Sequence, residues 1–335
     1  MRIVVTNQIF AETHKLLTAN AEVIGNSAPE PWSHEMVRDR CRDADAVLVF
    51  MPDRIDAAFI AACPKLKVIG AALKGYDNID STAAERAGVW VTIVPDLLTV
   101  PTAELAIGLM LGLGRYVLAG DQRIRTSGFN GWRPTLYGSG LDGARVGIVG
   151  FGRVGQAIAE RLIGFRCRVC AYDTRPNSVP AHLEQAVDTV ALNDLLAQSD
   201  YVVLALPLTE ATQHIIDAGT LSRMKPGALL VNPARGSLVD ERAVADALEA
   251  GRIAGYAADV FECEDWARAD RPSGIDTRLA APGAPTLLTP HIGSAVTGVR
   301  RQIELAAAQS IIEALAGKQP AGAVNNPDRP RACSA

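Results

Sequence analysis

The segment RVGIVGFGRVGQAIAERL, residues 145–162, restricts the possible folds of this chain more than any other. An apolar run leads directly into Gly150, Gly152 and Gly155, and a helical pattern begins within the same turn. In a G-x-G-x-x-G turn between strand and helix, the first glycine permits the tight turn and the second lets a ligand approach the backbone. The third lets the helix pack on the strand. We therefore expect a parallel sheet covered by helices around this segment.

Strand-like and helix-like patterns alternate along the chain. The expected strands are almost entirely apolar, as in VVLAL (202–206) and ALLVN (228–232), which is typical of parallel strands covered on both faces. The pattern predicts an α/β protein with two doubly wound parallel-sheet domains, of which the second contains the glycine turn. Strands are expected at 2–5, 46–50, 66–72, 89–94, 145–149, 167–172, 201–206, 228–232, 254–258 and 286–289, and helices at 11–19, 34–42, 102–118, 120–127, 153–164, 192–197, 240–250 and 295–316.

The composition indicates a globular protein that binds neither nucleic acid nor membranes. Apolar residues make up 48% of the 335 residues and the formal net charge is −4, so no positive field attracts phosphate backbones or anionic lipid. The most apolar helical pattern, residues 105–114, is well short of the ~20 residues that span a bilayer. The N-terminus lacks a signal-peptide pattern. The six cysteines are scattered, and the pair Cys167 and Cys170 lies inside a predicted strand, so we expect a cytoplasmic protein without a metal site.

The strand after the glycine turn ends in Asp173, within CRVCAYD. A carboxylate at this place accepts hydrogen bonds from both ribose hydroxyls of a dinucleotide and repels the 2′-phosphate of NADP, so the sequence favours NAD. Arg175 offers the alternative of holding that phosphate. Arg153, at the helix start, could contact the pyrophosphate or be a solvated surface charge.

Three further polar residues follow predicted strands of the second domain: Arg235 in NPARGS, Glu264 in DVFECE and His291 in TPHIGS. Carboxyl ends of parallel strands meet at one edge of a sheet, so we expect these side chains near the glycine turn. A guanidinium holds a small anion, an imidazole exchanges a proton near neutral pH, and a carboxylate orients the imidazole. Each residue alone has a plain structural explanation, and the acidic run ECED around Glu264 could be solvated surface. Together they predict an enzyme active site.

With these motifs in this order, the chain resembles the D-2-hydroxyacid dehydrogenase family from about residue 45 to 316. The resemblance implies a flavodoxin-like substrate domain from residues 1–98 and 290–335, an NAD-binding Rossmann domain at 99–289, a cleft that closes on the substrate, and a homodimer. It implies that Arg235 binds the substrate anion, that His291 is the acid–base and that Glu264 pairs with His291. Asp259 would contact the nicotinamide. The cofactor residues that the resemblance implies are Lys74, Thr102, Gly150, Gly152, Arg153, Val154, Gly155, Asp173, Leu206, Pro207, Pro233, Ala234, Asp259, His291 and Gly293.

Longer stretches are similar to one branch of this family, the enzymes that oxidise phosphite with NAD. Asp173 and Cys263 depart from the usual pattern of that branch, which has glutamate and methionine at these places. The similar stretches are VFMPDRID (49–56), GAALKGYDNID (70–80), VPDLLTVPTAELAIGL (94–109), GWRPTLYGSGL (131–141) and GYAADVFECEDWARADRP (255–272). The branch implies phosphite as the substrate, with substrate contacts from Met51, Lys74, Gly75, Trp132, Tyr137, Arg235 and Ser294.

Lys74 carries the main prediction about the substrate. Gly75 suffices for a turn after the strand predicted at 66–72, so the turn does not require a lysine. Phosphite carries more negative charge than the carboxylate of a hydroxy acid, and a second cation besides Arg235 would bind it. The alternative is a solvated loop lysine.

In the predicted reaction, a hydride leaves phosphorus for the nicotinamide and water attacks phosphorus. His291, oriented by Glu264, would take the proton of the water, or Arg235 would share in activating it.

Two other functions remain open. One is a dehydrogenase for D-2-hydroxy acids, and the other is an NAD-sensing regulatory or scaffold protein, which would have no use for all three polar residues.

Overall fold

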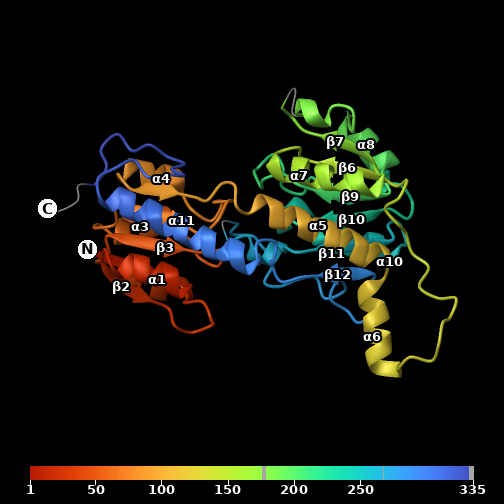
Figure 1. The fold of residues 1–335 in the computed structure, drawn as a ribbon, viewed down its shortest axis with the longest axis horizontal. Helices are drawn as coiled ribbons and strands as arrows, with labels where there is room; N and C mark the ends of the chain where they lie inside the picture. The colour runs from red at the N-terminus through yellow and green to blue at the C-terminus, as the bar shows by residue number, and fades with distance from the viewer. Residues whose placement is uncertain (176–178, 267, 332–335) are drawn as a thin grey trace. The chain divides into compact units, whose positions relative to one another are not determined.

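The computed structural model describes residues 1–175, 179–266 and 268–331. The chain forms two compact units (Figure 1). Unit 1 contains both ends of the chain, Met1–Leu98 and Ser294–Ala335, with the short stretch Trp266–Ala269, and unit 2 contains Thr99–Asp265 and Asp270–Gly293. Unit 2 extends to Gly293, whereas the resemblance implied a cofactor domain that ends at residue 289. His291 therefore belongs to unit 2.

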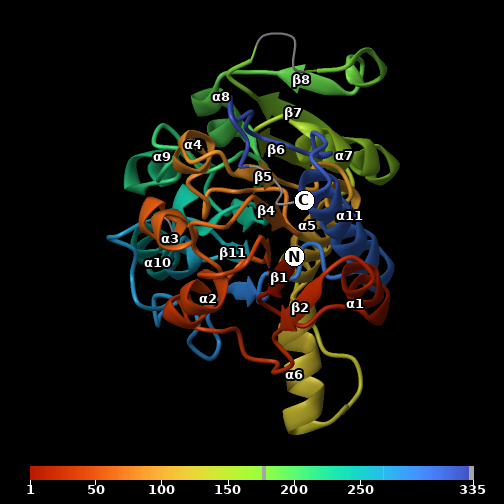
Figure 2. The same cartoon turned by 90° about the vertical axis from the view of Figure 1, so that its left-hand side faces the viewer.

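Unit 1 is built on a five-stranded parallel sheet in the order β2-β1-β3-β4-β5 (Figure 2). The central strands β3 and β4 are buried throughout because their residues are small or aliphatic. The strands are β1 (Arg2–Val5), β2 (Glu22–Gly25), β3 (Ala46–Val49), β4 (Val68–Ala71) and β5 (Trp90–Thr92), and the helices are α1 (Ala11–Thr18), α2 (His34–Cys41), α3 (Ala57–Ala62), α4 (Ser81–Arg86) and α11 (Thr297–Leu315).

Unit 2 is built on a seven-stranded sheet in the order β12-β11-β10-β9-β6-β7-β8. The strand order changes direction beside β6, and ligands of open α/β sheets bind at the carboxyl edge at such a switch. The strands are β6 (Arg145–Val149), β7 (Arg168–Tyr172), β8 (Val187–Thr189), β9 (Tyr201–Leu204), β10 (Leu229–Asn232), β11 (Gly255–Ala258) and β12 (Thr286–Leu288). The helices are α5 (Thr99–Gly114), α6 (Val117–Ser127), α7 (Arg153–Leu162), α8 (Leu192–Gln198), α9 (Ala218–Arg223) and α10 (Glu241–Glu249), with short 3-10 helices η1 (Ile163–Phe165), η2 (Ala181–Leu183), η3 (Gly236–Leu238) and η4 (Glu262–Glu264).

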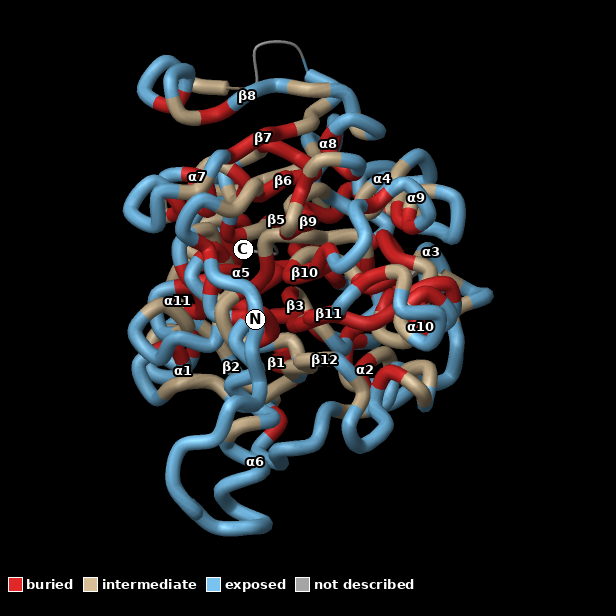
Figure 3. Tube along the Cα trace, turned by 90° about the vertical axis from the view of Figure 1, so that its right-hand side faces the viewer, coloured by how far each residue is buried: buried red, intermediate tan, exposed pale blue. Residues whose placement is uncertain are grey.

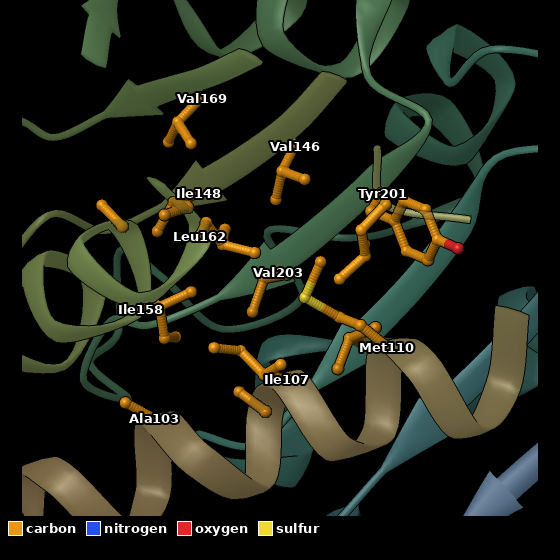
Figure 4. Close-up of a cluster of buried hydrophobic side chains, with 14 of the residues drawn as sticks. Ala103, Ile107, Met110, Val146, Ile148, Ile158, Leu162, Val169, Tyr201 and Val203 are labelled. Carbon is orange, nitrogen blue, oxygen red and sulfur yellow. The ribbon is translucent and has the colours of Figure 1, made fainter. Parts of the chain in front are cut away.

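Unit 2 has two hydrophobic clusters: one lies between its sheet and the helices α5 and α7 (Figure 4), and the other packs the sheet against α8, α9 and α10. Ile107 and Met110 of α5 meet Val203 and Ile148 of the sheet, while Ile158 of α7 closes the cluster. Full burial of such side chains stabilises the fold by about 1.5–3 kcal/mol each. In both units the central strands are buried beneath more exposed helices and loops (Figure 3).

The fold class expected from the sequence is confirmed: both sheets are parallel and helices cover them. The sequence analysis missed the edge strands β2 and β8, and the helix expected at 102–118 starts at Thr99 and ends at Gly114. Tyr116, with φ 51°, separates it from α6. Among the described residues, no single helix is long and apolar enough to cross a bilayer, although α5 and α6, which meet at a bend of 58°, reach that length and composition together.

Candidate active site

The glycine turn after β6 has a backbone that requires its glycines. Gly150 has φ 92°, a conformation that other residues rarely adopt, and a Cβ there would overlap Ala205. A Cβ on Gly155 would overlap the carbonyl oxygen of Gly150, so glycine lets α7 pack onto β6. Beside Gly152 the space is open except for the guanidinium of Arg175, 3.7 Å from a Cβ position. This cradle fits a dinucleotide, because a pyrophosphate can approach the backbone at the start of α7.

Asp173 follows β7, and its carboxylate is held from two sides. The N–H of Phe151 donates to Oδ2 at 2.7 Å, and Arg175 donates to Oδ1 through Nε and to Oδ2 through Nη2, both at 3.0 Å. The hydrogen-bonded guanidinium of Arg175 lowers the pKa of Asp173 to about 2, so the carboxylate is ionised at neutral pH. The side chain of Arg175 is 65% exposed, and solvent weakens such an ion pair. Arg175 can therefore turn away from Asp173.

Arg175→Ala should raise the preference for NAD over NADP, because Asp173 then meets a 2′-phosphate without a neighbouring cation. We expect the ratio of the two kcat/KM values to change about tenfold, the scale of one charge-assisted hydrogen bond. Steady-state kinetics with both cofactors measure the ratio. Arg168→Ala, at an exposed position in β7, is the control, and an unchanged ratio in Arg175→Ala would show that Arg175 has no part in cofactor choice.

The loop after β12 places His291, which has φ 54°. Its N–H donates to the carbonyl of Asp259 at 2.8 Å. The carboxylate of Asp259, 1% exposed, accepts from the hydroxyl of Thr289 at 2.6 Å and from the N–H groups of Ile292 and Gly293 at 2.8 Å each. Burial raises the pKa of Asp259. Asp259 therefore fixes the loop that carries His291, and its contact with a nicotinamide stays a prediction.

Glu264 and His291 form a hydrogen-bonded pair, with 2.8 Å between Oε2 and Nδ1. The other oxygen of Glu264 accepts from the N–H of Phe261 at 2.9 Å, which closes the turn η4. Both side chains are partly exposed, 24% for Glu264 and 29% for His291. The carboxylate orients the ring. This arrangement leaves Nε2 as the nitrogen that can exchange a proton with a substrate.

Arg235 follows β10 and begins the turn η3. Its carbonyl accepts from Nδ2 of Asn232 at 2.7 Å, and Oδ1 of Asn232 accepts from the N–H of Ala234 at 3.1 Å. Its own Nη1 donates to the carbonyl of Ala234 at 2.8 Å. Buried Asn232 thus holds the turn, and Arg235 itself is half-buried. Because β10 and β11 are neighbours, η3 and η4 meet at the carboxyl edge of the sheet.

Gly236 is required where these two turns meet, because a Cβ there would overlap backbone atoms of Phe261 and Glu262. Gly236→Ala should therefore lower the free energy of unfolding by about 3 kcal/mol, the upper range for overpacking a core. Denaturant titration measures the loss. Gly108→Ala is the matched control, since nothing lies near a Cβ at this position of α5 and alanine favours helix. Equal stability of Gly236→Ala and the unsubstituted protein would contradict the close approach.

In unit 1, Lys74 and Met51 lie in neighbouring loops. β3 pairs with β4 in parallel, with Val49 opposite Ala71, so the loops that follow begin at the same edge of the sheet. Lys74, Gly75 and Met51 are all half-buried. These predicted substrate residues therefore lie in loops at the carboxyl edge of the sheet of unit 1.

A buried carboxylate fixes these loops. Oδ2 of Asp53 accepts from the hydroxyl of Thr6 at 2.5 Å and from the N–H of Phe50 at 2.7 Å, and burial raises the pKa of Asp53 to about 6. Nδ2 of Asn78 donates to the carbonyl of Asp53 at 2.7 Å. This bond links the loop after β4 to the loop after β3.

The other predicted residues are distributed more widely. Trp132 and Tyr137, expected at the substrate, lie in the loop after α6 and are 76% and 74% exposed; their role stays a prediction. Among the predicted cofactor residues, Pro233 is buried, whereas Pro207 and Arg153 are exposed. The half-buried residues of the predicted site are Thr102, Val154, Leu206, Ala234 and Ser294.

Sequence reasoning missed the buried acids around the site. The run ECED was interpreted as possible surface, but Glu262 is 7% and Asp265 is 1% exposed. Glu241 and Asp53 are equally buried, at 2% and 5%. A buried acid and a solvated acid look the same in a sequence, so no sequence signal could have indicated them.

Unit 2 has the fold and the cradle of a dinucleotide-dependent dehydrogenase. Residues 107–293 match the model of the D-isomer specific 2-hydroxyacid dehydrogenase, NAD binding domain. A glyoxylate reductase of Thermococcus onnurineus is 37% identical over 329 residues, which cover 97% of this chain and 96% of the relative. A crystal structure of a Thermus thermophilus protein matches with a TM-score of 0.86 and 32% identity over 97% of this chain and 100% of the other. An NADPH-dependent glyoxylate/hydroxypyruvate reductase of Sinorhizobium meliloti, in complex with NADP and malonate, matches with a TM-score of 0.84 and 28% identity, covering 99% of each chain.

This chain therefore belongs to the D-isomer specific 2-hydroxyacid dehydrogenase family. It is an oxidoreductase with an NAD-binding domain, as the sequence predicted. The named relatives are glyoxylate reductases and not phosphite-oxidising enzymes.

Proposed function

We propose that this protein is a phosphite dehydrogenase (phosphonate dehydrogenase), which oxidises phosphite to phosphate with NAD. The long stretches similar to the phosphite-oxidising branch support this choice within the family. The structural observation that carries it is Lys74. Lys74 is half-buried in a loop that Asn78 joins to the loop of Met51, which is more typical of a binding residue than of a solvated lysine.

The proposed roles follow from the chemistry of the substrate. Arg235 and Lys74 balance the negative charge of the phosphite oxygens, because a guanidinium and an ammonium both form charge-assisted hydrogen bonds. His291 takes a proton from the water that attacks phosphorus, and Glu264 stabilises the resulting imidazolium. The water oxygen becomes the fourth oxygen of phosphate. NAD, when bound, accepts the hydride from phosphorus. Arg235 could also share in activating the water.

A second candidate is a D-2-hydroxyacid dehydrogenase that reduces glyoxylate. The relatives favour it more directly than phosphite, since those of Thermococcus onnurineus and Pyrococcus furiosus, 37% and 38% identical, are named glyoxylate reductases. Arg235 would bind the carboxylate and His291 would exchange a proton with the hydroxyl. The pair of Glu264 and His291 serves both reactions, so the substrate has to be decided by assay.

Purified full-length protein should be assayed by the absorbance of NADH. The test compares kcat/KM for phosphite with NAD, for glyoxylate with NADH, and for a panel of D-2-hydroxy acids with NAD. We expect phosphite to have the highest value. Glyoxylate reduction without phosphite oxidation would establish the second candidate. Cofactor binding without turnover of any substrate would favour an NAD-sensing protein.

We also propose a homodimer. In α6 none of the residues is buried, and α6 stands out from unit 2 together with the loop that follows it (Figures 1 and 3). Phe129, Trp132 and Tyr137 in this loop are each at least 74% exposed, and a second copy of the chain would remove this apolar surface from water. A monomeric mass by light scattering would contradict the proposal.

A further inference from the structure

The turn η3, which follows Arg235, and the turn η4, which contains Glu264, are joined by a buried carboxylate. Asp265 comes directly after Glu264 and is 1% exposed. Its Oδ2 accepts from the N–H of Ser237 at 2.6 Å. Ser237 lies two residues after Arg235, so this bond connects the two turns at the positions next to their proposed catalytic side chains.

A second connection lies beside the first. The N–H of Glu262 donates to Oε1 of Glu241 at 2.8 Å, and the N–H of Glu241 lies 3.5 Å from Oε2 of Glu262. The remaining oxygen of Glu262 pairs with Nε2 of His214 at 2.5 Å. Burial raises the pKa of Glu241 to about 7. The start of α10, η4 and the segment before α9 are therefore linked through these side chains.

Buried carboxylates are costly to desolvate, and apolar residues of similar volume often give equal or better stability. Core packing alone therefore does not explain why acids occupy this place. A carboxylate that accepts a hydrogen bond from a backbone N–H of another turn fixes the position and the orientation of the two segments relative to each other. Reaction rates depend strongly on such alignment, since a displacement of ~1 Å can cost about 100-fold.

We propose that Asp265 is a positioning residue, which holds η4 against η3 and thereby aligns Glu264 and, through it, His291. This inference rests on the catalytic roles proposed above for Arg235, Glu264 and His291. Asp265 acts through these residues and not on the substrate. The connection between Glu262 and Glu241 supports the same alignment.

The first test compares Asp265→Ala with Asp265→Asn. Alanine removes the acceptor of the Ser237 N–H, and we expect kcat to fall about 10- to 100-fold with the KM for NAD within about twofold. Asparagine keeps an oxygen that can accept this bond, so it should restore kcat to within about threefold. The matched control is Asp200→Ala. Asp200 accepts from the N–H of Arg145 at 2.9 Å at the amino edge of the same sheet, and kcat should be unchanged.

A double-mutant cycle with Glu264→Gln separates positioning from general damage to the fold. If Asp265 acts through Glu264, then Asp265→Ala should lower kcat by a much smaller factor in the Glu264→Gln background than in the unsubstituted protein. Independent, multiplicative losses would overturn the role of Asp265 and leave the proposed function intact. Full activity of Glu264→Gln would overturn the proposed role of Glu264 and, with it, that of Asp265. If Asp265→Ala fails to fold, Asp265→Ser replaces it in the cycle.

Discussion

Asparagine in place of His291 should lower kcat by about 10²- to 10⁴-fold, the usual contribution of a general acid–base group. Asparagine cannot take up a proton, although it is similar in size and its amide NH2 can still donate a hydrogen bond to Glu264. The affinity for NAD, measured by fluorescence titration, should change little. The loss should appear with whichever substrate the protein oxidises or reduces, because both candidate reactions need a proton exchanged at this position.

The chain offers a matched control in His182. Its Nε2 lies 2.9 Å from Oε1 of Glu160 in the same unit, with side-chain exposures of 61% and 45%. His182→Asn removes a histidine–glutamate pair on the surface and should leave kcat unchanged. Full activity of His291→Asn would exclude His291 as the base and leave Arg235 as the group that activates water.

Lys74→Ala should raise the KM for phosphite about 10- to 100-fold, which corresponds to the ~1.5–3 kcal/mol of a hydrogen bond to a charged group. The KM for NAD should stay within about twofold. The physical reason is the loss of one of two cations that balance the substrate oxygens. Initial rates over a range of phosphite concentrations at saturating NAD measure the effect.

Lys65→Ala is the control for this substitution. Lys65 lies before β4, at the opposite edge of the sheet, and pairs with Asp43 at 2.8 Å on the surface. Its removal should leave both KM values unchanged. Should Lys74→Ala behave in the same way, Lys74 is a solvated loop lysine and the argument for phosphite loses its structural support.

The sequence predicted the central strands well, because they are apolar runs with clear turns at their ends. It missed β2 and β8 because edge strands need not be apolar: β2 reads EVIG with no buried residue, and β8 reads VDT with one. The helices α3, α4 and α9 are six residues long, too short for a helical period to appear.

The sequence indicated those candidate site residues that come soon after a strand. Arg235, Glu264 and His291 come after β10, β11 and β12, and parallel order alone brings such positions to one edge. The acids that support them could not be predicted, because a buried and a solvated glutamate look the same in a sequence. Glu262 and Asp265 lie in one acidic run with Glu264, and their burial follows only from the approach of η3 to η4.

The amino-acid sequence by itself determined the class of this protein: two parallel sheets, a glycine turn for NAD, and an arginine, a glutamate and a histidine at strand ends. These are local signals, since each depends on residues within a few positions of one another. Tertiary structure alone decided how the N–H of Phe151 holds Asp173, how Asp259 fixes the loop of His291 and how Asp265 joins two turns. Each of these contacts joins backbone and side-chain groups whose distance depends on strand order and close packing, which no single stretch of sequence specifies.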